Sequence, residues 1–375
     1  MKAKILLSIF SIVALLSCNS GKNSDITAGG DTLHFDYSRL LTVVDYGKYR
    51  TVDIADPWKE GRTLHRYVLV NDPSAPHLPK GTVIKVPVKN AMVFTTVHAA
   101  LLADLQSSGV IKGMADVRYV KRKDIKALVD SHRILDVGNS MAPDIEKIID
   151  AGADCVFVSP FENSGGYGKV EEINIPIVEC AEYMENSPLA RAEWMRFYGL
   201  LLGREQEADS LFACVDSCYH MLQQQASKAR HGGHRRTVLF DKMTGSVWHV
   251  PGGRSTIGQM VKDAGGDYPW ENDTHGGSLA LPFENVLERA GEADVWLFRY
   301  SSDHTYTKAD LLGERDGYKM LKAFRQNEVY GCNVEKTSFY EETPFRPDLL
   351  LSDIIQILHP NLIQSKHLRY FENTK

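Results

Sequence analysis

The spacing of hydrophobic residues divides the chain into segments of different character. Residues 50–187 alternate short runs rich in Val, Ile and Leu, typical of strands, with stretches whose apolar residues recur at helical spacing. Residues 188–229 show helical spacing almost throughout, and the alternation of strand and helix patterns resumes in residues 230–375. Because strands that alternate with helices form parallel βαβ units, the pattern predicts an α/β fold with two Rossmann-like lobes.

The helical segment supplies the expected connection between the lobes. Pro188 suits the first turn of a helix, and Gly203 suits the end of that helix. The next helix, from about Arg204 to Ala229, would be about 40 Å long at 1.5 Å per residue. A helix of this length can reach from one lobe to the other, so we expect one long interdomain α-helix.

One segment in each lobe repeats the same pattern. IEKIIDAGADCVFV (145–158) and FENVLERAGEADVWLF (283–298) both place a Glu at a helix start, then apolar pairs, a Gly, an Ala-Asp pair and a hydrophobic strand. The repeat predicts that the lobes are structurally related halves. Further predicted elements are strands at 50–56, 64–70, 82–88 and 175–180 and helices at 95–106 and 347–358.

The N-terminus has the pattern of a lipoprotein export signal. Lys2 and Lys4 give a short positive start, an apolar run at 5–16 is too short to cross a membrane comfortably, and Ser17 precedes Cys18. We therefore expect a signal peptide over residues 1–17 and lipid on Cys18. Residues 18–49, rich in Gly, Ser, Asp and Thr over their first half, are expected to form a flexible tether.

Composition excludes several classes of protein. The net charge of −5, without a long basic run interleaved with aromatic residues, argues against nucleic-acid binding. No second segment is apolar enough for a membrane span, so lipid is the only expected anchor. Cys214 and Cys218 share one helix face but lack a second ligand pair, and no Ser-His-Asp or Cys-His arrangement can be argued. We expect neither a metal site nor a cofactor.

Several segments, taken in order, resemble the substrate-binding lipoproteins of ABC importers for iron complexes (siderophores and haem) and cobalamin. They are DVGNSMAPDIEKIIDAGADCVFVSP (136–160), IPIVE (175–179), LARAEWMRFYGLLLGREQEADSLF (189–212), RSTIGQMVKDAGGDYPW (254–270), LPFENVLERAGEADVWLF (281–298) and FRPDLLLSDIIQILHP (345–360). The resemblance implies a helical-backbone, class III periplasmic binding protein fold. Residues 58–79 are extra relative to compact family members.

The resemblance also implies a partner and a role. A protein of this family delivers its ligand to an ABC transporter permease dimer. It recognises the ligand without making or breaking a covalent bond, so we expect no enzymatic activity. We also expect a monomer. Family members dock through one exposed Glu per lobe, which implies Glu146 and Glu284 here. A carboxylate in the first turn of a helix also complements the helix dipole. Stabilisation of the two helices is therefore an alternative reason for Glu146 and Glu284 to occupy these positions.

Ligand is expected between the lobes, at the carboxyl ends of the strands. Arg and aromatic residues dominate the loops there, and they suit an anionic aromatic chelate, with a ferric siderophore favoured over cobalamin or haem. The candidates are Thr95, Arg118, Tyr119, Phe161, Tyr167 and Tyr183 in the first lobe, and Lys242, Trp248, Arg254, Arg299, Tyr300 and Arg346 in the second.

Two further functions stay open at this point. A binder of free zinc or manganese would need several His and carboxylate side chains to converge. An envelope enzyme that releases metal from a chelate is also compatible with an exported protein. PGGRST (251–256) offers backbone N–H groups at a helix start to an anion, but it lacks the Gly-Lys-Ser/Thr of a phosphate loop.

Overall fold

The sheet of the first lobe contains five parallel strands in the order β12-β11-β6-β7-β8. The computed structural model describes residues 29–162, 166–230, 235–363 and 367–375, so the predicted signal peptide and Cys18 lie outside the described residues. The strands are β6 (Ala91–Val93), β7 (Ile111–Met114), β8 (Leu135–Asp136), β11 (Cys155–Val158) and β12 (Ile177–Glu179). The connecting helices are α1 (Thr96–Asp104), α2 (Lys123–Asp130), α3 (Ile145–Asp150) and α4 (Lys169–Glu172), and β9 (Gly138–Asn139) and β10 (Ala142–Pro143) form a small hairpin.

A second sheet precedes the parallel sheet in the sequence, and it begins within the segment predicted to be a flexible tether. Its strands are β1 (Asp31–Leu33), β2 (Leu41–Asp45), β3 (Tyr49–Ala55), β4 (Thr63–Val70) and β5 (Thr82–Lys85). The first four strands are antiparallel, and β5 runs parallel to β4. The tether predicted for residues 18–49 is therefore wrong from residue 31 onward, because residues 31–49 contribute paired strands.

Two buried carboxylates fix the N-terminal segment to the rest of the protein. Glu193 accepts hydrogen bonds from the backbone N–H groups of residues 36–38 at 2.8–2.9 Å, and Glu185 accepts from those of Arg39 and Leu40 at 3.1 Å. Both carboxylates are buried. Backbone donors satisfied in this way hold residues 36–40 in one conformation, which explains why this polar segment is ordered.

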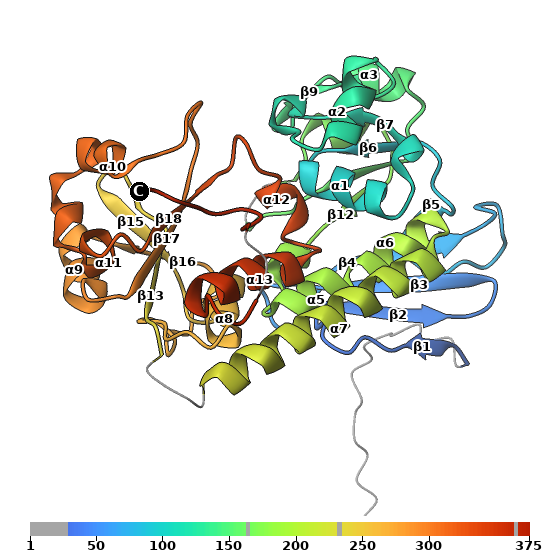
Figure 1. Ribbon diagram of the computed structural model, residues 1–375. Helices are drawn as coiled ribbons and strands as arrows, with labels where there is room; N and C mark the ends of the chain where they lie inside the picture. Colours follow the sequence, from blue (N-terminus) through green and yellow to red (C-terminus); the bar gives the residue numbers. More distant parts are fainter. Residues whose placement is uncertain (1–28, 163–165, 231–234, 364–366) are drawn as a thin grey trace, which may run out of the picture.

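A run of helices connects the lobes. It consists of α5 (Pro188–Glu193), α6 (Met195–Leu202) and α7 (Glu205–Arg230). Ser187 caps α5, and Gly203 ends α6 with a left-handed φ of 63°. At 26 residues, α7 is about 39 Å long and extends from the first lobe to the second (Figure 1). The predicted long interdomain helix is confirmed.

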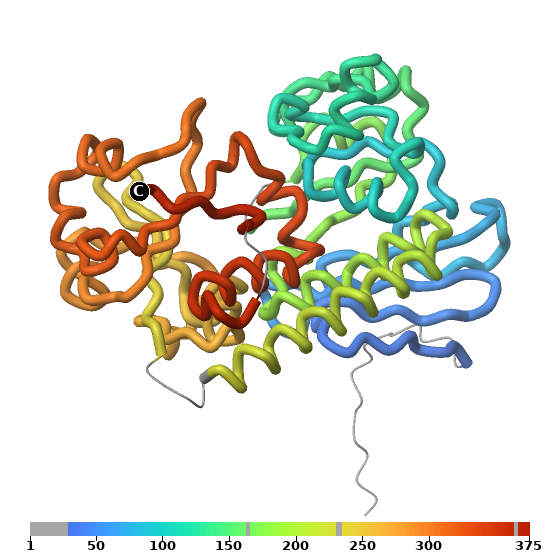
Figure 2. The backbone as a smooth tube through the Cα atoms, in the orientation of Figure 1, coloured from blue at the N-terminus to red at the C-terminus, as the bar shows by residue number. Residues whose placement is uncertain are grey.

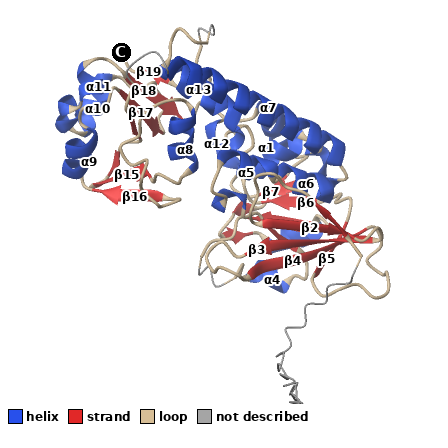
Figure 3. Cartoon of the chain, turned by 90° about the horizontal axis from the view of Figure 1, so that it is seen from below, coloured by secondary structure: helices blue, strands red, loops and turns tan. Residues whose placement is uncertain are grey.

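Helices α5 and α6 lie between the N-terminal sheet and α7 (Figure 3). The Tyr67 ring of β4 packs against Phe197 of α6 with ring centroids 6.2 Å apart, and Val88 N–H donates to the Leu201 carbonyl. The tube view shows the N-terminal sheet running beside these helices and away from the second lobe (Figure 2). The sheet therefore belongs to the first lobe.

The second lobe contains a four-stranded sheet in the order β13-β17-β18-β19, with β19 antiparallel to the rest. Its strands are β13 (Val238–Phe240), β17 (Val295–Tyr300), β18 (Val329–Asn333) and β19 (Glu372–Asn373), and a smaller antiparallel sheet holds β14 (Met243–Thr244), β15 (Val247–Pro251) and β16 (Ser278–Leu281). The helices are α8 (Thr256–Asp263), α9 (Phe283–Ala290), α10 (Lys308–Glu314), α11 (Lys322–Arg325), α12 (Phe339–Glu342) and α13 (Pro347–Leu358). Helix α13 packs along α7, which ties this lobe to the connecting helix.

Hydrophobic burial is continuous across the two lobes. One cluster of buried residues runs from the N-terminal sheet through α6 and α7 into the second lobe, and it contains Trp194, Tyr198, Trp248 and Trp296. Among the described residues, no helix combines the length and apolar character needed to span a bilayer.

Candidate functional site

The carboxyl ends of the first-lobe strands converge on the space between the lobes. The chain runs from β6 to β7 and β8 on one side and returns to β11 and β12 on the other, which places a topological switch point between β6 and β11. Open α/β sheets bind ligands at such a point. Phe94 and Thr95 leave β6 there, and Thr95 is the N-cap of α1, where its Oγ1 accepts from His98 N–H at 3.4 Å.

The interlobe cavity has a volume of about 460 Å3 and is lined by both lobes. Its first-lobe wall comes from residues at the ends of β6 and β7, and its second-lobe wall comes from the loops that follow β17 and β18 and from α12. The lining residues are Phe94, Thr95, Thr96, Asp116, Tyr119, Lys121, Ser301, Val334, Glu335, Thr337, Tyr340 and Glu341.

The N-lobe cavity adjoins the interlobe cavity, since Phe94 and Thr95 line both. It has a volume of about 680 Å3 and lies within the first lobe. Its walls are largely apolar and aromatic, with Met141 and Phe161 exposed to solvent. Tyr167 also lines this cavity, and its hydroxyl donates to Glu179 at 2.8 Å. Together the two cavities offer space for a ligand much larger than a metal ion.

Polar contacts close the interlobe cavity on one side. Lys121 Nζ of the first lobe lies 2.6 Å from Glu335 Oε2 of the second, and the Lys121 backbone N–H donates to Glu341 Oε1 at 2.8 Å. The remaining Glu341 oxygen is buried and has no hydrogen-bond partner among the described residues. These contacts hold the lobes against each other at the edge of the cavity.

A buried polar chain runs from the cavity floor into the first lobe. His98 Nδ1 lies 2.5 Å from Thr95 Oγ1, His98 Nε2 lies 3.0 Å from Glu182, and the Tyr198 hydroxyl donates to the other Glu182 oxygen at 3.2 Å. Burial alone would lower the pKa of His98, but the facing Cys180 and Glu182 outweigh it and raise that pKa to about 10. Burial also raises the pKa of the Cys180 thiol, so the Glu182 carboxylate is the anion that holds the imidazolium.

The protonation of His98 decides what Thr95 can offer a ligand. An imidazolium donates from both ring nitrogens, so His98 donates to Glu182 and to Thr95 Oγ1. The Thr95 hydroxyl then keeps its own proton for an acceptor in the adjoining cavities. Thr95 is thereby set as a hydrogen-bond donor at the cavity floor.

The structure brings together four of the predicted ligand contacts. Thr95 and Tyr119 line the interlobe cavity, and Thr95, Phe161 and Tyr167 line the N-lobe cavity. Arg118 is exposed beside them, with its guanidinium 4.6 Å from the centre of the Tyr119 ring. Tyr183 lies nearby, but its hydroxyl donates to the Pro160 carbonyl. These residues remain predicted contacts of a ligand.

Two predicted contacts in the second lobe are wrong. Trp248 is completely buried, and its indole N–H donates to the Phe240 carbonyl at 3.2 Å. Tyr300 is buried as well, and its hydroxyl accepts from Tyr306 N–H at 3.0 Å. Both side chains belong to the core because their strand positions face inward.

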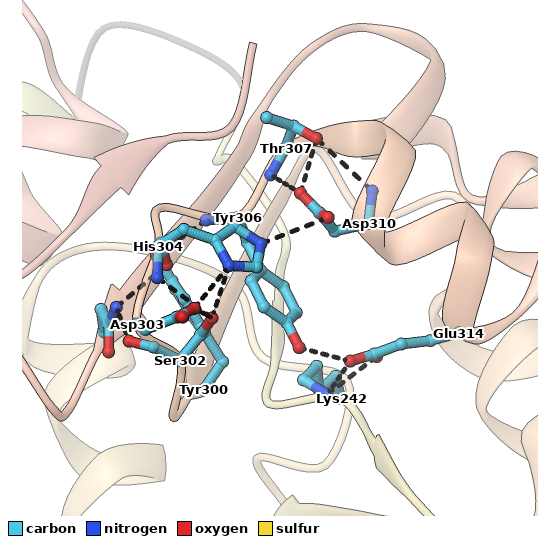
Figure 4. A network of polar contacts seen from close by, with 10 residues as sticks. Lys242, Tyr300, Ser302, Asp303, His304, Tyr306, Thr307, Asp310 and Glu314 are labelled. Atoms are coloured by element: carbon cyan, nitrogen blue, oxygen red, sulfur yellow. Dashed lines mark hydrogen bonds and ion pairs between the residues drawn. The ribbon is translucent and has the colours of Figure 1, made fainter.

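Lys242 is held within a polar network of the second lobe, and it lines neither cavity. Its Nζ lies 2.8 Å from both oxygens of Glu314, which also accepts from the Tyr306 hydroxyl at 3.0 Å (Figure 4). In the same network, His304 lies between the carboxylates of Asp303 and Asp310. The charge of Lys242 is thus neutralised locally, and the prediction that it grips ligand is not supported by its position.

The remaining predicted arginines also line neither of these two cavities. Arg254 is exposed just before α8, and Arg346 forms a bidentate contact with Asp348 at the start of α13. Arg299 pairs with Asp241 through two hydrogen bonds of 2.9 and 2.5 Å. The sequence did not reveal Lys121, Glu335 and Glu341, whose place at the cavity depends on the approach of the two lobes.

The two predicted docking glutamates occupy equivalent places. Glu146 is exposed in the first turn of α3, and Glu284 is exposed in the first turn of α9. A guanidinium nitrogen of Arg315 lies 3.7 Å from Glu284, whose side chain keeps 76% of its surface exposed. Neither side chain lines the cavities, so both are available to a partner.

Comparisons with known proteins agree with this architecture. A family model described as periplasmic binding protein matches residues 104–335. An uncharacterized lipoprotein of Methanocaldococcus jannaschii is 27% identical over 298 residues, which covers 77% of this chain and 69% of the relative.

Solved structures share the fold at low sequence identity. A periplasmic heme-binding protein from Pseudomonas aeruginosa superposes with a TM-score of 0.60 at 12% identity, covering 76% of this chain and 98% of that one. A protein of an ABC-type Fe3+-hydroxamate transport system from Saccharomonospora viridis gives a TM-score of 0.57 at 17% identity, covering 73% and 94%. With the family model, they confirm the predicted resemblance and the two-lobed fold: this chain belongs to the periplasmic binding protein family.

Proposed function

We propose that this protein is the substrate-binding component of an ABC importer and captures an iron chelate between its lobes. The observation that carries the proposal is the pair of adjoining cavities at the carboxyl ends of the first-lobe strands, with volumes of about 460 and 680 Å3. The second lobe closes the interlobe cavity from the opposite side. Membership of the periplasmic binding protein family supports the same role, which is recognition of a ligand without making or breaking a bond.

The cavity lining favours a chelate of low net charge. Tyr119, Phe161 and Tyr167 offer aromatic surface, and Thr95 offers a hydroxyl donor. Among the described residues, the N-lobe cavity carries one lysine, Lys169, while the interlobe cavity carries one lysine and three carboxylates, from Asp116, Glu335 and Glu341. A strongly anionic chelate would meet repulsion there. We therefore favour a ferric hydroxamate-type siderophore, in which three hydroxamate anions balance the charge of Fe3+ and leave a nearly neutral complex, over the anionic chelate expected from the predicted arginines.

Cobalamin is the second candidate ligand. It is bulky and nearly neutral, so it needs aromatic surface and few cations, and the two cavities provide both. Haem carries two carboxylates and fits the acidic lining less well. Binding of a free Zn or Mn ion and an enzymatic reaction on the chelate are both excluded if the intact chelate binds and is recovered unchanged.

The protein is proposed to work from a membrane surface outside the cytoplasm. The charged start, the apolar run and the Ser17-Cys18 junction support a signal peptide and a lipid on Cys18. The related archaeal protein is named a lipoprotein. The ABC transporter permease dimer would then receive the ligand at the same membrane. Mass spectrometry that finds an unmodified Cys18 in the cell-derived protein would contradict the anchor.

Removing the aromatic walls should weaken chelate binding. We expect the double substitution Tyr119→Ala, Phe161→Ala to lower the affinity for the chelate at least about tenfold, because each ring loses burial and stacking against the ligand. Titration calorimetry with a ferric hydroxamate and with cobalamin measures the change. Met320→Ala, at an exposed position of the second lobe that lines neither cavity, is the control. Equal affinity of the double variant and the wild type would place the ligand elsewhere.

A further inference from the structure

A third cavity, here called the rear cavity, lies between the lobes and has a volume of about 160 Å3. Tyr340 lines both this cavity and the interlobe cavity, so its ring forms the boundary between them. Helix α5 of the connecting segment packs against α8 and α13 of the second lobe (Figure 1). Residues of these three helices and of α12 line the cavity. Two guanidinium groups, those of Arg191 and Arg299, line it, and no carboxylate does so among the described residues.

Arg191 is the unusual member of this group. Its Nε is completely buried and has no hydrogen-bond partner among the described residues. The nearest carboxylate that acts on it electrostatically is Glu182, whose oxygens are already taken by His98 and Tyr198. A buried guanidinium N–H without an acceptor is costly unless something pairs with it. The rear cavity is the space in which such a partner would lie.

Arg299 presents a second guanidinium to the same space. It donates from Nε and Nη2 to the two oxygens of Asp241, and the third nitrogen, Nη1, has no hydrogen bond to the described residues. The guanidinium also lies 5.7 Å from the centre of the Phe339 ring and 5.8 Å from that of Tyr340. Asp241 and these rings hold Arg299 in position, so its remaining donor is oriented in advance.

The start of α8 adds backbone donors. Thr256 and Ile257, its first two residues, line the rear cavity. The first N–H groups of a helix have no partner within the helix, and Ser255 caps only the N–H of Gly258, at 3.0 Å. The positive end of the eight-residue helix therefore faces the same space as the two arginines. Thr256 and Thr343, whose side chains carry hydroxyl groups, also line the cavity.

We infer that the rear cavity binds a small oxyanion of the size of phosphate or sulfate. The planar donor fork of arginine matches the oxygens of such an anion, and a helix start supplies the complementary N–H groups. The cavity volume suits one small anion and is much smaller than the space that we assign to the chelate. The anion site is separate from the proposed chelate site, so a test can refute either proposal without refuting the other.

Thermal unfolding of the purified full-length protein tests the site, with inorganic phosphate as the probe. The buffer is sodium HEPES, whose anion is too large for the cavity, at constant ionic strength. We expect the wild-type Tm to rise and saturate with phosphate, by about 3–6 °C at high occupancy. Arg191→Met should abolish the dependence on phosphate. It should not lower the Tm in HEPES alone, because it removes a guanidinium whose buried Nε–H has no acceptor among the described residues.

Two further variants make the result specific. Arg133→Met removes an exposed arginine that does not line the rear cavity. It should leave the phosphate response intact. Thr256→Val keeps the side-chain size but removes one hydroxyl, and it should weaken phosphate binding roughly tenfold, which keeps the test valid if Arg191→Met does not fold. Chelate affinity should change less than about threefold in Arg191→Met. A wild type insensitive to phosphate, equal responses of wild type and Arg191→Met, or loss of chelate binding in Arg191→Met would each overturn the assignment.

Discussion

Replacing Glu182 by Gln should lower the free energy of unfolding by about 3 kcal/mol. Glu182 and His98 are both buried, with 3.0 Å between His98 Nε2 and Glu182 Oε1. Removing one member of a buried pair leaves the other charge without its partner, and this costs about 3–5 kcal/mol. Urea denaturation of the wild type and the variant measures the difference. The matched control, Glu205→Gln, breaks the exposed ion pair with Arg50 and should cost less than about 1 kcal/mol.

The same pair should make the stability of the protein depend on pH. The pKa of His98 is raised from 6.5 to about 10, so the stability that it contributes is fully present below 6.5 and is lost as the pH rises toward 10. The pKa of Glu182 is lowered from 4.5 by His98 despite burial, so its contribution is present above that value and is lost as the pH falls. In Glu182→Gln, the free energy of unfolding should fall less steeply than in the wild type as the pH rises from 6.5 to 10. If Glu182→Gln kept the pH dependence of the wild type and lost less than about 1 kcal/mol in free energy of unfolding, Glu182 and His98 would not form a buried ion pair.

The double substitution Glu146→Ala, Glu284→Ala should abolish chelate uptake in cells while leaving chelate affinity in solution within about twofold of the wild type. Both carboxylates are exposed in first helical turns and line neither cavity. Exposed charges at an interface mainly govern association with a charged partner. Uptake of labelled chelate by cells that produce each variant, together with titration of the purified proteins, measures the two effects separately.

The control for docking uses other carboxylates on the same helices. Asp150→Ala, Glu288→Ala removes two exposed charges from α3 and α9 outside their first turns and should support normal uptake. Full uptake by Glu146→Ala, Glu284→Ala would show that the transporter reads another surface. Loss of solution affinity in a folded double variant would instead connect these carboxylates with the ligand.

The repeated pattern in the two lobes was visible in the sequence because it encodes equivalent structure. In the first lobe, Asp154 accepts from the backbone N–H groups of Lys89 and Asn90, just before β6. In the second lobe, Asp294 accepts from the N–H of Thr237, just before β13. Each Asp precedes a strand that pairs in parallel with the strand it anchors. Local periodicity and one short motif were sufficient to predict these units.

Three strands of the N-terminal sheet were predicted from the runs at 50–56, 64–70 and 82–88, but its first two strands, β1 and β2, were not. The run LLTVVD at 40–45 has the composition of a strand, which the tether prediction overlooked, whereas residues 31–39 are mostly polar. Their order depends on Glu185 and Glu193, which are about 150 residues away in the sequence and accept the backbone N–H groups of residues 36–40. A contact between such distant positions leaves no periodic signal in either segment.

The sequence predicted several residues that line the two cavities, but it did not predict the charge of the cavity lining. The ends of β6, β7 and β11 carry Thr95, Tyr119 and Phe161 to the cavities as expected. The predicted cationic character was not found in these two cavities, because Arg299 pairs with Asp241 and lines the rear cavity, and Lys242 pairs with Glu314. Residue type alone does not show which carboxylate a basic side chain will pair with, and it does not show which side of a strand faces the core.

Titration of the purified wild-type protein with a panel of ligands tests the central claim most directly. The panel contains a ferric hydroxamate siderophore, a polyanionic ferric catecholate siderophore, cobalamin, haem and a zinc salt. We predict one-to-one binding of a chelate of low net charge, the ferric hydroxamate or cobalamin, with a Kd at or below about 1 μM that changes little with salt. Tight binding of zinc alone, or binding only of the polyanionic chelate with strong salt dependence, would contradict the assignment of the two cavities to a nearly neutral chelate.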